Sequence, residues 1–210
     1  METKNCENNN TLHMDPKEMC NAAYASADLE SKSSAAESSH NDMQEASQES
    51  LQCGSFFDRY IITDEVMGQG GQAFVTKGFD LQKQKYVAVK TYVKAQMDEH
   101  ELDAARHEKQ IMSQLDHQNI IGLTESYEDD YCLYLVMDMM ADDLRNVMTS
   151  CDQAFDENTA KVLFRQMLDA VSYCHNRGIV HRDVKLENFF LDFQESDKQI
   201  TVKLGDFGVA

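Results

Sequence analysis

The stretch GIVHRDVKLENFF, from Gly178 to Phe190, concentrates charge beside bulky apolar residues. Six of the eight positions from 181 to 188 carry polar or ionisable side chains: His181, Arg182, Asp183, Lys185, Glu187 and Asn188. Charged groups next to apolar strands are costly unless they are paired or bound to something. The stretch therefore predicts a bound ligand, and other segments of the chain point to the same one.

Glycines gather in the segment VMGQGGQAFV, residues 66–75, between two strand-like runs. Gly68, Gly70 and Gly71 lack Cβ atoms, so the backbone there can approach phosphate groups closely. A glycine-rich hairpin turn is the commoner explanation of such a segment. Taken alone, the segment leaves both interpretations open.

The run VAVK ends in Lys90, which stands in an otherwise apolar strand. A buried ammonium group needs an anionic partner. Glu108 on the following predicted helix is the candidate, because it borders the apolar stripe of that helix. The stripe residues lie three, four and seven positions after Glu108, at Ile111, Met112 and Leu115.

The composition changes at Phe56. Residues 1–55 contain no Val, Ile, Phe or Trp. We predict a disordered polar, acidic tail there, because such a segment cannot bury enough apolar surface to offset its ordering entropy. After it, runs rich in aromatic and β-branched residues alternate with glycines and predict antiparallel strands. These runs are RYIITDEVM (59–67), AFVTKGF (73–79) and YVAVKTYV (86–93).

Helical spacing dominates the later segments. Residues 97–115 predict one amphipathic helix, because apolar residues recur on one side while charges fill the rest. A strand at 131–139 and a short helix around 142–148 follow. Residues 155–178 predict a long helix with a polar cap near its start and a glycine at its end. Its apolar stripe comprises Leu163, Met167, Ala170, Val171 and Cys174.

Composition excludes several classes of protein. The net charge of -18 argues against a nucleic-acid or anionic-membrane partner, and it suits either basic partners or plain solubility. The six cysteines form no C-x-x-C pair, which indicates neither a zinc site nor a disulfide framework and favours a cytoplasmic or nuclear setting. No run approaches the roughly 18 apolar residues of a membrane span.

With HRDVKLEN and the run GDFG at 205–208, the chain from about Phe56 to Ala210 resembles a eukaryotic protein kinase domain of the serine/threonine type. The glycine segment, V-A-V-K, the helix glutamate, H-R-D-x-K-x-x-N and D-F-G occur in that family's order. The resemblance implies an α+β, bilobal fold. The amino-terminal lobe, residues 56–137, would hold a five-stranded antiparallel sheet and a helix, and residues 138–210 would form part of a helical carboxy-terminal lobe.

The resemblance also implies a site for ATP and Mg²⁺. The glycine loop would cover the phosphates, while Lys90, held by Glu108, would pair with the α- and β-phosphates. Asp183 would accept the proton of the substrate hydroxyl, and Lys185 would contact the transferred phosphate. The implied nucleotide pocket also comprises Val75, Ala88, Met137, Asp138, Met140 and Phe190 around the adenine, with Asn188 and Asp206 as the Mg²⁺ ligands.

Two acidic residues predict a substrate preference. Glu187 and Asp143 match positions that, in arginine-directed kinases, meet an arginine upstream of the phosphorylated residue. For Asp143, a ribose contact or a helix cap is the alternative. Three residues depart from the family pattern: Gln72 replaces the usual aromatic residue, Ala73 replaces the third glycine, and Phe190 replaces the usual leucine beneath the adenine.

The sequence stops just after the D-F-G motif, so it resembles a truncated kinase domain. Before that point we expect a polar hairpin loop around residues 195–198. Two functional hypotheses remain. The first is ATP- and Mg²⁺-dependent transfer of phosphate to Ser/Thr hydroxyls of protein substrates. The second is a catalytically inactive fragment that acts as a nucleotide-binding or regulatory interaction module.

Overall fold

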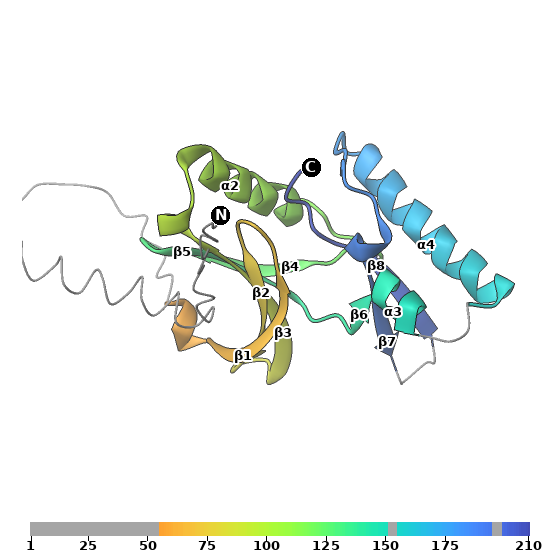
Figure 1. The fold of residues 1–210 in the computed structure, drawn as a ribbon, viewed down its shortest axis with the longest axis horizontal. Coiled ribbons are helices and arrows are strands. Elements are labelled where there is room, and N and C mark those ends of the chain that lie inside the picture. Colours follow the sequence, from red (N-terminus) through yellow and green to blue (C-terminus); the bar gives the residue numbers. More distant parts are fainter. Residues whose placement is uncertain (1–54, 151–154, 195–198) are drawn as a thin grey trace, which may run out of the picture.

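A computed structural model describes residues 55–150, 155–194 and 199–210. The predicted tail, except for its last residue, and the loop at 195–198 lie outside the described residues. Two sheets lie along the long axis of the molecule, each with its own helices (Figure 1). Of the helices described, none combines the length and hydropathy needed to cross a lipid bilayer.

The first sheet is antiparallel and has the strand order β1-β2-β3-β5-β4. Its strands are β1 (Tyr60–Gln69), β2 (Phe74–Asp80), β3 (Lys85–Val93), β4 (Leu123–Glu128) and β5 (Cys132–Asp138). The apolar and β-branched runs predicted as strands form β1, β2, β3 and β5. The expectation of a five-stranded antiparallel sheet is confirmed.

Strand β3 separates two apolar cores, because successive side chains of a strand point to opposite faces. Val87, Val89 and Val93 belong to the core that also contains Phe56 of the short helix η1 (Phe56–Asp58). Ala88 and Tyr92 belong to the larger core on the opposite face. Lys90 has the same parity as Ala88 and therefore lies on this second face.

Helix α2 (Glu99–Ser113) covers the second face. Its start is fixed by a capping box, in which the Glu101 amide donates to Asp98 Oδ1 at 2.8 Å and the Asp98 amide donates to Glu101 Oε2 at 2.9 Å. The buried residues of the helix are Ala105, Glu108, Ile111 and Met112. The amphipathic pattern predicted for residues 97–115 thus directs one carboxylate into the core.

The second sheet carries the remaining helices. Its strand order is β6-β7-β8, with β6 (Asp142–Asp143), β7 (Phe189–Gln194) and β8 (Gln199–Leu204). The helices of this part are α3 (Leu144–Ser150) and α4 (Glu157–His175). Residues 142–143 were predicted as helix, but they pair with β7 as a two-residue strand. That part of the prediction was wrong.

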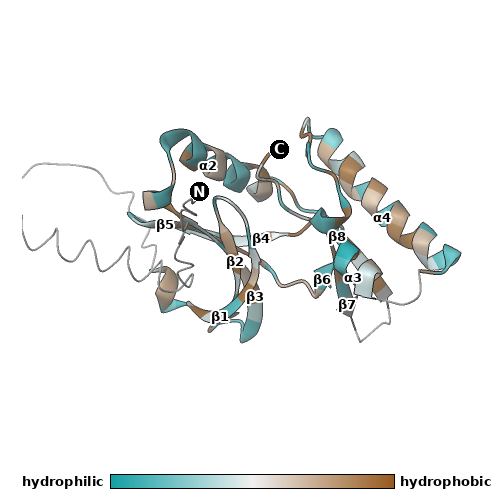
Figure 2. Ribbon diagram, viewed as in Figure 1, coloured by the Kyte–Doolittle hydropathy of each residue, from teal (hydrophilic) through white to brown (hydrophobic). Residues whose placement is uncertain are grey.

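Helix α4 follows the predicted pattern. Asp156 caps it by accepting hydrogen bonds from the amides of Asn158 and Thr159. Apolar and polar residues alternate along the helix (Figure 2). Gly178 follows its end with φ of 72°, a left-handed conformation that favours glycine. Leu163, Ala170 and Cys174 are the buried residues of the predicted stripe, and Met167 and Val171 are partly buried.

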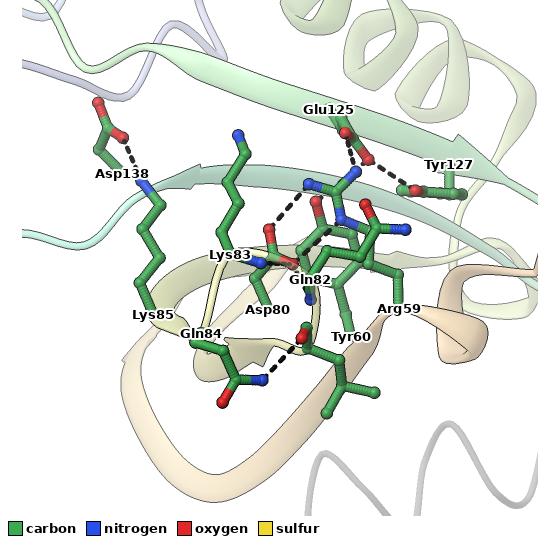
Figure 3. Close-up of polar contacts among 11 residues, drawn as sticks. Arg59, Tyr60, Asp80, Gln82, Lys83, Gln84, Lys85, Glu125, Tyr127 and Asp138 are labelled. Carbon is green, nitrogen blue, oxygen red and sulfur yellow. Dashed lines mark hydrogen bonds and ion pairs between the residues drawn. The ribbon is translucent and has the colours of Figure 1, made fainter.

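Arg59, just before β1, joins three strands of the first sheet (Figure 3). Its guanidinium donates to Asp80 at 3.1 and 2.8 Å and also bonds to Glu125. Asp80 is fully buried, and its Oδ1 also accepts from two backbone amides of the following turn at 2.9 and 3.0 Å. The hydrogen bond from Arg59, helped by these amides, lowers the pKa of Asp80 to about 2.

Candidate active site

A cleft of about 880 Å³ is lined by residues from both sheets. The structure brings nearly all the sequence-predicted site residues to this cleft. Those that line it are Gly68, Gly70, Gly71, Val75, Ala88, Lys90, Glu108, Met137, Asp138, Met140, Lys185, Asn188, Phe190 and Asp206. Asp183 is not a lining residue, but it bonds directly to Lys185 and Asn188.

Lys90 is a cation that lines the cleft. Its ammonium lies 2.7 and 3.0 Å from the two carboxylate oxygens of Glu108 and 2.9 Å from Asp206 Oδ1. Burial works to lower the pKa of Lys90, but the charges of Glu108 and Asp206 outweigh it and raise the pKa. The group is therefore held in its charged form, and the predicted contact with Glu108 is present.

The carboxylate of Glu108 has a further partner that the sequence did not predict. Glu108 is 1% exposed, and the hydroxyl of Tyr92 donates a hydrogen bond to its Oε2. Burial raises the pKa of Tyr92, and the Glu108 carboxylate adds to that rise, so the hydroxyl keeps its proton. The alternation of β3 was a usable signal, because Tyr92 stands two residues after Lys90 on the same face.

His181 connects the HRDVKLEN segment to the residues after β8. The Asp183 amide donates to His181 Nδ1 at 3.3 Å, so Nε2 carries the ring proton and donates to the Gly205 carbonyl at 3.0 Å. The ring also lies 4.9 Å from that of Phe207, centroid to centroid. The buried histidine thus fixes the backbone beside Asp183 to the backbone beside Asp206.

Asp183, Lys185 and Asn188 form a second polar group. Lys185 Nζ lies 2.7 Å from Asp183 Oδ2, and the side-chain amide of Asn188 donates from Nδ2 to the same oxygen at 3.0 Å and to the Asp183 carbonyl at 2.8 Å. The hydrogen bond from Lys185, followed by that from Asn188, lowers the pKa of Asp183. An ionised carboxylate beside an ammonium can orient a hydroxyl group and receive its proton.

Asp206 has φ of 60°, a left-handed conformation that is costly for a residue with a side chain. Burial works to raise the pKa of Asp206, but the charge and the hydrogen bond of Lys90 outweigh burial, and the net effect is a lowered pKa. Such strain is often found at functional sites. Here the backbone directs an ionised carboxylate toward Lys90.

The unusual residues of the site have identifiable contacts. Gln72 donates to Glu101 Oε1 at 3.0 Å and so joins the glycine loop to the start of α2. Phe190 lines the cleft beside Gly205, where an added Cβ would lie 3.2 Å from Phe190 Cε2 and 2.7 Å from Ile121 Cδ1. The glycine therefore leaves room for Ile121 and for the phenylalanine.

Glu187 and Asp143, the two residues predicted to bind an arginine of the substrate, also line the cleft. Glu187 forms an ion pair with Arg145 of α3. Asp143 accepts a hydrogen bond from the Asn146 amide at 2.8 Å, which is the helix-cap contact weighed as the alternative. Their role in substrate selection stays a prediction.

The side chains present fit a magnesium nucleotide. The cleft volume falls in the range of small-molecule sites, roughly 300 to 1,000 Å³. Within the described ranges, no group of three or more His, Cys, Asp or Glu residues forms a preassembled metal site. Mg²⁺ in nucleotide sites uses one or two carboxylates together with phosphate oxygens and water. Asp206 supplies such a carboxylate, and the side-chain amide oxygen of Asn188, which also lines the cleft, would be a further oxygen ligand.

Comparison with protein families and known proteins agrees with this geometry. Residues 61–210 match the family described as "Protein kinase domain". "Serine/threonine-protein kinase RAD53" of Saccharomyces cerevisiae is 33% identical over 154 residues, which are 73% of this chain and 18% of that protein. "Serine/threonine-protein kinase SIK1" of Mus musculus is 35% identical over 150 residues, or 71% of this chain and 18% of that protein.

Among solved structures, the crystal structure of Rad53 1-466 in complex with AMP-PNP is similar to this chain, with a TM-score of 0.61 and 34% sequence identity. The match covers 72% of this chain and 38% of that chain. This chain therefore spans less than two fifths of the length of each of these relatives.

Proposed function

This chain belongs to the protein kinase domain family, and from that membership we propose that the protein transfers the γ-phosphoryl group of ATP, bound with Mg²⁺, to serine or threonine hydroxyls of protein substrates. The observation that carries the proposal is the convergence of Lys90, Glu108 and Asp206 at 2.7 to 3.0 Å in one cleft. Two relatives are named as serine/threonine-protein kinases, which supports serine and threonine as the acceptor residues.

Nucleotide binding would use the cleft between the glycine loop and the residues after β8. The nucleotide analogue AMP-PNP bound to Rad53 suggests the ligand class for this chain. Lys90 would turn its ammonium toward the phosphates while Glu108 holds it from behind. Asp206 and Asn188 would hold Mg²⁺, which supplies positive charge to the phosphate oxygens.

Catalysis would depend on positioning and charge. Phosphoryl transfer spreads negative charge over several oxygens, so a site that neutralises them lowers the barrier. Asp183 would orient the acceptor hydroxyl and take its proton, since its lowered pKa keeps the carboxylate ionised. Lys185, 2.7 Å from Asp183, would supply a positive charge to the transferred group.

We also propose a preference for substrates with arginine upstream of the acceptor. Glu187 already pairs with one guanidinium, that of Arg145, and so can accept this kind of partner. A basic substrate would also suit a chain with a net charge of -18.

A peptide phosphorylation assay with Mg²⁺ and ATP tests the proposal, with wild type compared to Asp183→Asn. We expect turnover in the wild type and its loss in the variant, while both bind nucleotide. If the wild type binds nucleotide but phosphorylates no peptide, or if Asp183→Asn phosphorylates as well as the wild type, the regulatory alternative is favoured instead.

A further inference from the structure

We propose that Tyr92 is a positioning residue of this site, whose hydroxyl fixes the Glu108 carboxylate and thereby aims the Lys90 ammonium at the nucleotide phosphates. The inference rests on the proposed function, because it concerns the same nucleotide. It assigns a role to a residue that, from the sequence, would pass for part of the apolar core.

The position of Tyr92 follows from strand geometry. Lys90 and Tyr92 are two residues apart in β3, opposite Leu135 and Leu133 of β5. They share the face that α2 covers, and Tyr92 is only 4% exposed. A tyrosine buried to this degree needs a partner for its hydroxyl, and Glu108 supplies it.

The contacts of Lys90 explain why Glu108 needs a second donor. The ammonium has three N–H groups, and its three hydrogen bonds go to two oxygens of Glu108 and one of Asp206. A phosphate that approaches Lys90 must compete for these same N–H groups. The Tyr92 hydroxyl donates to Glu108 Oε2 from the buried side, so the carboxylate keeps a hydrogen bond when Lys90 turns to the nucleotide.

The ring of Tyr92 adds a second restraint. Lys90 Nζ lies 5.5 Å from the ring centroid, within the distance of an attractive cation–π contact. The hydroxyl and the ring thus act on Glu108 and Lys90, respectively. Replacement by phenylalanine keeps the ring and removes the hydroxyl, which isolates the contact with Glu108.

The first sheet offers a matched control. The Tyr127 hydroxyl donates to Glu125 Oε2 at 2.6 Å in β4. Tyr127→Phe therefore removes the same chemical group from a tyrosine–glutamate pair in the same sheet. Neither residue of that pair lines the cleft.

The test is a titration of the full chain with Mg·ATP and, separately, with adenosine, which lacks the phosphates. For Tyr92→Phe we expect the Kd for Mg·ATP to rise about tenfold, the effect of losing one hydrogen bond to a charged group. The Kd for adenosine should stay within about twofold, and Tyr127→Phe should change neither value. In a Glu108→Gln background, Tyr92→Phe should add less than about twofold, because its partner carboxylate is gone.

The outcomes separate the two claims. If the wild type binds no Mg·ATP, the proposed function fails and the inference fails with it. If the wild type binds and Tyr92→Phe binds equally well, or loses adenosine along with ATP, only the role of Tyr92 is overturned. An undiminished effect of Tyr92→Phe in the Glu108→Gln background would also overturn it.

Discussion

Replacing Asp80 with asparagine should destabilise the first sheet, because Asp80 is a fully buried carboxylate bonded to Arg59. Folding lowers its pKa from 3.8 to about 2. At about 1.4 kcal/mol for each pKa unit, this shift corresponds to about 2 kcal/mol of stability at pH 7. For a protein of this size the loss amounts to a fall in Tm of roughly 4 to 8 °C.

The pH dependence of the unfolding free energy provides a second test. A carboxylate whose pKa is lowered by folding stabilises the protein above its unfolded pKa and loses that effect as the pH falls toward its folded pKa. The difference in unfolding free energy between wild type and Asp80→Asn should therefore shrink as the pH falls from about 4 toward about 2. Urea unfolding at several pH values measures it.

Glu65→Gln is the control for Asp80→Asn. It also replaces a carboxylate in the first sheet, but the ion pair of Glu65 with Lys77 is exposed. Exposed pairs of this kind contribute about 0 to 1 kcal/mol. The reasoning is refuted if the two variants lose equal stability at pH 7, or if the Asp80→Asn difference stays constant as the pH falls.

The other predictions concern the site. Asp183→Asn should lower kcat for peptide phosphorylation by about 10² to 10⁴ without weakening Mg·ATP binding, and unchanged kcat would contradict its assignment. Glu187→Gln should lower kcat/KM about tenfold for peptides with arginine two or three residues upstream of the acceptor, whereas an equal loss on peptides without arginine would argue against that contact. Gly205→Ala should weaken binding of adenosine, because its Cβ would lie 2.7 Å from Ile121 Cδ1 and 3.2 Å from Phe190 Cε2, and Ile121→Val in the same chain, which removes that Cδ1, should restore part of the binding. Competition with a fluorescent nucleotide measures it, and an Ile121→Val change that restores nothing would contradict this reasoning.

Periodicity in the sequence was sufficient for the elements with a clear apolar face. Strand β3 and helices α2 and α4 lie where the patterns predict them, because each buries one side against the larger core. Strand β4, with the sequence LTESYE, carries mostly polar side chains and could not be located from its composition. Strand β6 was missed because two residues gain strand geometry only by pairing with β7.

In the site too, contacts that follow from a local sequence pattern were predictable, whereas contacts that depend on the tertiary fold were not. The Lys90–Glu108 contact was predictable, because a lysine in an apolar strand and a glutamate beside an apolar stripe each need a partner. The contact of Arg145 with Glu187 joins residues that are distant in sequence, so no local pattern indicates it. Tyr92 was missed because a tyrosine in an apolar strand is usually core.

The central claim is that polar side chains from separate segments converge to hold a metal-bound nucleotide. Calorimetric titration of the full chain with ATP, with and without Mg²⁺, tests it most directly when wild type is compared with Asp206→Asn. The account predicts that Mg²⁺ strengthens ATP binding to the wild type and that Asp206→Asn removes this gain. Absence of ATP binding, or an equal gain from Mg²⁺ in the variant, would contradict it.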